Sequence, residues 1–101
     1  MKCFTALSDV LSQINELPWS EALYLPAHSR WSLNTRCVVA NPDNLGEVIV
    51  HNGQQFRYAL NIQQIKDIYL NASAQQPNLD LEKFFQAFIY YYQHDAFLTF
   101  F

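Results

Sequence analysis

The sequence predicts an α+β fold with an N-terminal helix, a small antiparallel sheet and two C-terminal helices packed on one face of that sheet. Two observations lead to this prediction. Apolar residues recur every three or four positions in three separate segments, which is typical of amphipathic helices. Between the first and second of these segments lie runs rich in β-branched residues, and an Asn-Gly pair separates two such runs, as in a tight β-hairpin.

The first expected helix covers residues 5–17, where apolar and polar residues alternate with helical spacing. Thr5 is the expected N-cap, because its hydroxyl can accept a hydrogen bond from the unpaired N–H groups of the first turn. Pro18 ends the helix, since its ring removes a backbone donor and disfavours helical geometry in the preceding residue.

The middle of the chain predicts strands and turns. Residues 19–31 contain Pro26 and a short apolar run at 22–25, which favours an irregular segment or an edge strand. Residues 36–40 are rich in β-branched side chains and precede a cluster of turn formers at 41–44, so we expect a strand followed by a loop.

The clearest local signal is Asn52-Gly53, which lies between the runs 47–51 and 55–59. Asn-Gly supplies the positive φ angles that a two-residue hairpin turn requires. The sequence therefore predicts a three-stranded antiparallel sheet in which the 36–40 strand joins this hairpin.

Two amphipathic helices are expected after the hairpin. The first begins after Asn61, a favourable N-cap, and the second begins at Asn78 or Asp80 and ends near Gln93, with a break at 75–78 between them. The last helix has a wide apolar stripe formed by Leu81, Phe84, Phe85, Phe88, Ile89 and Tyr92.

Length and composition indicate one domain that spans residues 1–101. Half of the residues are apolar and 15% are charged, which provides material for one core.

Cys3 and Cys37 have no metal or redox spacing, so we expect reduced thiols in a cytoplasmic protein. No apolar stretch approaches the roughly 18–20 residues of a membrane helix, and polar residues interrupt the N-terminal segment where a signal peptide needs an apolar core.

Charge and motifs argue against direct nucleic-acid binding and against catalysis. The net charge is −3, and the six basic residues are scattered, whereas phosphate backbones require clustered Lys and Arg. The three histidines lack zinc-ligand spacing, and two glycines cannot form a glycine-rich phosphate loop. The His94-Asp95 pair has no accompanying nucleophile motif. We therefore expect no catalytic residue, no metal and no cofactor.

The C-terminal helix carries more aromatic side chains than one core-facing stripe requires. Two explanations remain open. The additional aromatics are covered by the sheet and by the apolar tail at 96–101, or some of them anchor a protein interface, as Tyr and Trp often do. Trp19 and Trp31 allow the same two interpretations.

Four segments resemble a bacterial family of small uncharacterised domains, which are similar to immunity proteins of contact-dependent growth inhibition systems. These segments are Leu17-Pro18-Trp19-Ser20-Glu21-Ala22-Leu23-Tyr24-Leu25-Pro26, Trp31-Ser32-Leu33-Asn34-Thr35, Tyr58-Ala59-Leu60-Asn61-Ile62-Gln63 and Phe88-Ile89-Tyr90-Tyr91-Tyr92. The resemblance implies noncovalent, stoichiometric binding to a cognate toxin domain, commonly a nuclease, whose active site or substrate surface is occluded. Immunity families bind their toxins through different surfaces, so the resemblance assigns no binding residue in this chain.

Four residues are candidate contacts with such a partner. The acids beside the hairpin, Asp43 and Glu47, are expected to meet Lys and Arg of a basic toxin, and Trp31 and Tyr90 are expected to act as buried anchors. For Asp43, the role of an ordinary turn residue is an equally good explanation. The alternative function is a structural or adaptor protein that self-associates through the aromatic C-terminal helix.

Overall fold

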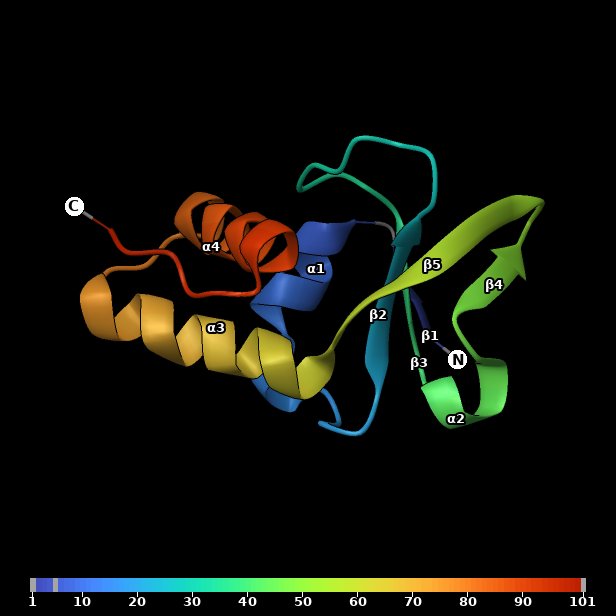
Figure 1. The fold of residues 1–101 in the computed structure, drawn as a ribbon, viewed down its shortest axis with the longest axis horizontal. Helices are drawn as coiled ribbons and strands as arrows, with labels where there is room; N and C mark the ends of the chain where they lie inside the picture. The colour runs from blue at the N-terminus through green and yellow to red at the C-terminus, as the bar shows by residue number, and fades with distance from the viewer. Residues whose placement is uncertain (1, 5, 101) are drawn as a thin grey trace.

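The computed structural model describes residues 2–4 and 6–100, and over these residues it forms a five-stranded antiparallel sheet with the N-terminal helix and the two C-terminal helices on one side (Figure 1). The strand order is β1-β3-β2-β5-β4. The elements are β1 (Lys2–Phe4), α1 (Leu7–Ser12), the 3₁₀ turn η1 (Ile14–Glu16), β2 (Ala22–Pro26), β3 (Cys37–Ala40), α2 (Pro42–Leu45), β4 (Val48–His51), β5 (Gln54–Asn61), α3 (Ile62–Gln75) and α4 (Leu81–His94). The predicted α+β class is confirmed. The prediction of a three-stranded sheet in which residues 36–40 join the hairpin was wrong, because β3 pairs with β1 and β2, and β2 lies between β3 and the hairpin.

The central strand of the sheet is β2, and the prediction that residues 19–31 form an irregular segment or an edge strand was wrong here. β2 pairs with β3 on one side and with β5 on the other, and all five of its residues are buried. A short apolar run without alternation is typical of a strand that is covered on both faces. Pro26 fits because it is the last residue of the strand.

Each face of the sheet has its own core. Leu23 and Leu25 point to the face that α1, α3 and α4 cover, while Tyr24 points to the opposite face. There, Tyr24 packs with Ile49 and Phe56, because the β4–β5 hairpin curls over that face. The Tyr24 hydroxyl donates a hydrogen bond to the backbone carbonyl of Gly46, which fixes the segment between α2 and β4.

The pairing of β2 with β5 contains a β-bulge. Leu23 pairs with Leu60 and Tyr24 pairs with Tyr58, so Ala59 is an extra residue in β5. Both Ala59 and Leu60 are therefore buried in the core beneath the helices. An extra residue of this kind increases the local twist and bends the strand, in agreement with the curl of the hairpin.

The N-terminal helix is shorter than expected, because α1 ends at Ser12 and a 3₁₀ turn follows it. The expected cap, Thr5, lies outside the described residues, and the N-cap position belongs to Ala6, which makes no side-chain cap. The first N–H groups of α1 instead donate to loop carbonyls, from Leu7 to Thr35 (2.7 Å) and from Ser8 to Leu33 (2.9 Å). A long-range contact thus replaces the local cap.

The region 41–44 also differs from the expected loop, since Pro42–Leu45 form the one-turn helix α2. The Asn41 side chain accepts a hydrogen bond from the Asp43 N–H (2.9 Å), and Pro42 occupies the first turn, where its missing N–H costs nothing.

The hairpin turn and both C-terminal helix starts match their local sequence signals. Asn52 and Gly53 have φ angles of 51° and 76°, and His51 pairs directly with Gln54. Asn61 forms a reciprocal capping box with Gln64. The Asp80 carboxylate accepts from the Lys83 N–H at 2.8 Å. In the described part of the chain, no helix combines the length and the apolar character that a membrane span requires.

We expect Tyr24→Phe to lower the free energy of unfolding by about 1 kcal/mol near neutral pH, because it removes the hydrogen bond to Gly46. The pKa of the Tyr24 hydroxyl is raised, mainly by burial and further by Tyr58 and Glu47. A tyrosine in the unfolded chain ionises at about pH 10. Above that pH the unfolded state therefore binds fewer protons than the folded state, and the free energy of unfolding falls.

Urea denaturation of both proteins from neutral pH to about pH 11 checks this expectation. The original chain should lose more stability than Tyr24→Phe above about pH 10. Parallel pH profiles for the two proteins would contradict it.

Candidate functional site

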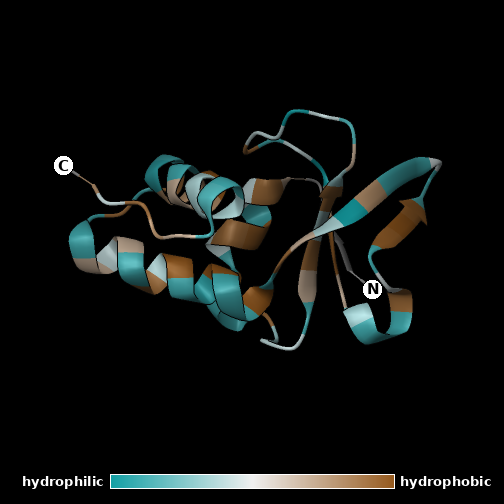
Figure 2. Cartoon of the chain, viewed as in Figure 1, coloured by the Kyte–Doolittle hydropathy of each residue, from teal (hydrophilic) through white to brown (hydrophobic). Residues whose placement is uncertain are grey.

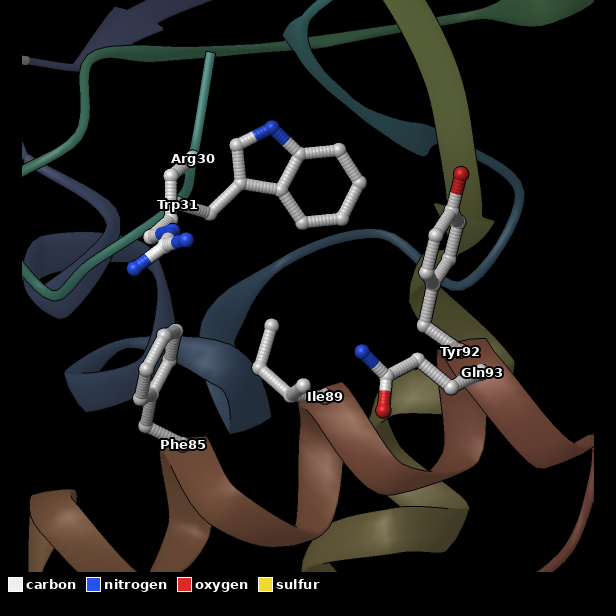
Figure 3. Close-up of a pocket in the computed structure, with 6 residues that line it drawn as sticks. All are labelled: Arg30, Trp31, Phe85, Ile89, Tyr92 and Gln93. Carbon is white, nitrogen blue, oxygen red and sulfur yellow. The ribbon is translucent and has the colours of Figure 1, made fainter.

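An aromatic groove lies between α4 and the loop 27–36 that connects β2 to β3 (Figure 3). Its volume is about 350 Å³, at the lower end of the range of ligand and side-chain sites. Arg30 and Trp31 come from the loop, and four side chains come from α4: Phe85, Ile89, Tyr92 and Gln93. The side chains of Ile89 and Gln93 extend from α4 toward the Trp31 and Tyr92 rings.

Trp31 is fixed in place by the sheet. Its indole Nε1–H donates to the carbonyl of Pro26 at 3.0 Å, and its ring meets the Tyr92 ring edge-on, with centroids 4.8 Å apart. The same loop is tied to the start of α1 through the Leu33 carbonyl. The loop wall of the groove is therefore connected both to the central strand and to a helix, which makes the groove preorganised.

The other wall is a ridge on α4. The helix buries Phe84, Ala87 and Phe88 in the core, so the neighbouring positions Phe85 and Ile89 lie half-buried on its outer side. Gln93 continues this ridge at the next turn. A second hollow of about 280 Å³ runs along the far side of the same ridge, where Glu82, Gln86, Tyr90 and Leu98 join it.

The C-terminal tail covers only part of the aromatic surface. It runs back along α3 and α4 (Figure 1), and Gln75 holds it by donating to the Leu98 carbonyl and accepting from the Phe100 N–H, both at 2.9 Å. Phe97 packs on Tyr91, with ring centroids 5.3 Å apart. Tyr92 is not covered in this way and remains 45% exposed. The tail therefore accounts for part of the additional aromatic surface, including Tyr91, and leaves Tyr92 exposed.

The four sequence-derived candidates divide into two distant pairs. Trp31 lines the groove, and Tyr90 lines the hollow on the other side of the α4 ridge, where its ring lies 4.3 Å from that of His94. Asp43 lies in α2 and Glu47 lies just before β4, across the sheet from α3 and α4 (Figure 1). The four residues therefore do not form one continuous surface.

The acidic pair has an environment of its own. Asp43 is exposed in the first turn of α2, where a carboxylate is favourable to the helix dipole. Glu47 lines a hollow of about 280 Å³ together with Val48, Arg57 and Tyr58. Because Arg57 lies in the same hollow, this end of the molecule carries both signs of charge.

The remaining polar chemistry is sparse. Among the described residues, no three His, Cys, Asp or Glu side chains come together as metal ligands. Cys37 is a buried thiol in the core, and the side chain of Cys3 lies outside the described part of the structure. The groove itself is lined by aromatic and apolar side chains, together with the polar side chains of Arg30 and Gln93.

Sequence reasoning missed Arg30 and Gln93 and assigned Phe85, Ile89 and Tyr92 to the core stripe. The available signal was the width of that stripe, which exceeds what one buried helix face needs. Ala87 is buried in the core instead, where its small side chain lets α4 approach the rest of the core closely.

We expect Trp31→Phe to lower the free energy of unfolding by about 1 kcal/mol, because it removes the donor to the Pro26 carbonyl. Amide hydrogen exchange should also become faster in the loop 27–36. Trp19→Phe is the matched control, since the Trp19 side chain is 67% exposed and its change should stay within about 0.5 kcal/mol. Equal effects of the two substitutions in urea denaturation would contradict the role assigned to Trp31.

A family model described as "Domain of unknown function (DUF7716)" matches residues 4–100. No curated protein and no solved structure matches the chain. Because the family match covers nearly all of the sequence, the chain belongs to this family of domains of unknown function.

Proposed function

We propose that this chain is an immunity protein that binds a cognate toxin domain, such as a nuclease, and neutralises it by noncovalent occlusion. The sequence resemblance described above suggests the class of partner. The structural observation that supports protein binding is the preorganised aromatic groove between Trp31 and α4.

The groove has the residue types of an interface hot spot. Trp, Tyr and Arg dominate such sites, and Trp31, Tyr92 and Arg30 all line this groove. Binding to flexible loops costs conformational entropy, and the hydrogen bond from Trp31 to Pro26 reduces that cost before a partner arrives. The second hollow behind the Phe85–Ile89 ridge gives the partner a further place to insert side chains.

In this proposal the acidic pair acts at a distance. A partner centred on the groove leaves Asp43 and Glu47 outside the central contact, because α2 and β4 lie across the sheet from α4. Their charges, together with the net charge of −3, would then attract a basic toxin during its approach.

The same groove also suits the alternative, an adaptor that self-associates through α4. The exposed Tyr92 favours this alternative as well as toxin binding. Sedimentation of the isolated chain and of Tyr92→Arg separates them, since self-association through α4 requires a toxin-free dimer that this substitution dissolves.

Growth protection tests the proposal directly. We expect co-expression of this chain with the C-terminal toxin candidate encoded beside its gene to restore growth, compared with an empty vector. Tyr92→Ala should raise the Kd for the toxin by roughly 30-fold or more, the effect of losing a hot-spot side chain. Trp19→Ala is the matched exposed-aromatic control and should leave the Kd unchanged. No protection from a toxin shown to be active would reject this pair.

Charge reversal tests the acidic pair. The double variant Asp43→Lys with Glu47→Lys should slow toxin association at low salt and have little effect at about 1 M salt, where the Debye length is only about 3 Å. The dissociation rate should stay unchanged if these residues lie outside the central contact. Association rates that are equal to those of the original chain at both salt concentrations would remove the electrostatic part of the proposal.

A further inference from the structure

The strand β4 has an open edge. It is last in the strand order and pairs with β5 alone. In an antiparallel pair, residues alternate between those whose backbone groups bond across the pair and those whose groups point away. The Tyr58 N–H donates to the Glu47 carbonyl at 2.8 Å, so with this register Glu47, Ile49 and His51 face β5. The N–H and C=O groups of Val48 and Val50 therefore point to the free edge.

This edge lacks several of the usual protections against pairing with another strand, although β4 is only four residues long. Exposed edges normally carry Lys or Pro, or they are twisted away by a bulge. β4 contains neither Lys nor Pro, and the bulge of this sheet lies between β2 and β5. The side chains of Val48 and Val50 are 40% and 68% exposed, and Figure 2 shows β4 as a hydrophobic segment at the rim of the molecule.

We propose that β4 pairs with β4 of a second copy of this chain, antiparallel, around a two-fold axis at Ile49. The run Glu-Val-Ile-Val-His at 47–51 is complementary to itself when it is read in opposite directions. In this register, Val48 lies opposite Val50 of the second copy, and Glu47 lies opposite His51 of the second copy. The outward backbone groups of both valines then bond across the axis.

Side-chain chemistry selects a second copy as the partner. On one face of the joined sheet, the valines of both copies form a single apolar cluster, and on the other face a carboxylate meets an imidazole at each end of the contact. A two-fold contact closes on itself, so it uses up the open edge and adds no third copy. The dimer leaves the groove at α4 accessible, because α4 and β4 lie on different sides of the sheet (Figure 1). The inference is thus independent of toxin binding.

Sedimentation velocity across a concentration series tests this pairing. The mass should rise with concentration from 11.8 kDa to twice that value. Val50→Pro removes one outward N–H and spares the hydrogen bonds to β5, so it should keep the single-chain mass at every concentration. Val50→Lys is a second variant that keeps the backbone donor and places a charge at the exposed position. Leu70→Lys is the matched control, because Leu70 is 63% exposed on α3 and should leave the dimer intact.

Hydrogen exchange tests the register. In the original chain, exchange of the Val48 and Val50 amides should slow by roughly tenfold or more at the concentrations that give the dimer, while the Ile49 amide stays protected at all concentrations. A single-chain mass throughout the series would overturn the proposal. A dimer that persists in both Val50 variants, or that dissociates only with Tyr92→Arg, would also overturn it, because the contact would then lie elsewhere.

Discussion

The burial of β2 on both faces is the constraint from which the rest of the structure follows. A strand with five buried residues needs partners on both sides and a cover on each face. The helices cover one face, and the curled β4–β5 hairpin covers the other. Two side-chain hydrogen bonds connect β2 to the distant surfaces, since Pro26 accepts from Trp31 and Tyr24 donates to Gly46. The groove and the hairpin are thus both fixed by the same strand.

This arrangement separates two surfaces with different chemistry. The α4 end presents aromatic side chains in a hollow, which suits insertion of partner side chains. The β4 end presents backbone hydrogen-bonding groups along an edge, which suits the addition of a strand. The two surfaces lie on different sides of the sheet, so the two proposals are compatible with each other. Together they describe an assembly of two copies, each with an accessible groove.

Local signals in the sequence predicted local structure. Asn52-Gly53, Asn61 and Asp80 each act on backbone groups within three residues, so their effects could be predicted without the fold. The central position of β2 could not, since strand order depends on pairing between distant segments. The candidate site was predicted only in part for the same reason. Trp31 meets Tyr92 across the fold, and Gln75 binds the tail 23 and 25 residues away.

The most direct test of the central claim is a hydrogen-exchange footprint of this chain alone and with a protein that is found to bind it. The claim is that the groove between Trp31 and α4 is the surface that binds protein. It predicts slower exchange on binding in the loop 27–36 and along α4, with no change at α2. Protection confined to α2 and β4, with α4 unaffected, would contradict it.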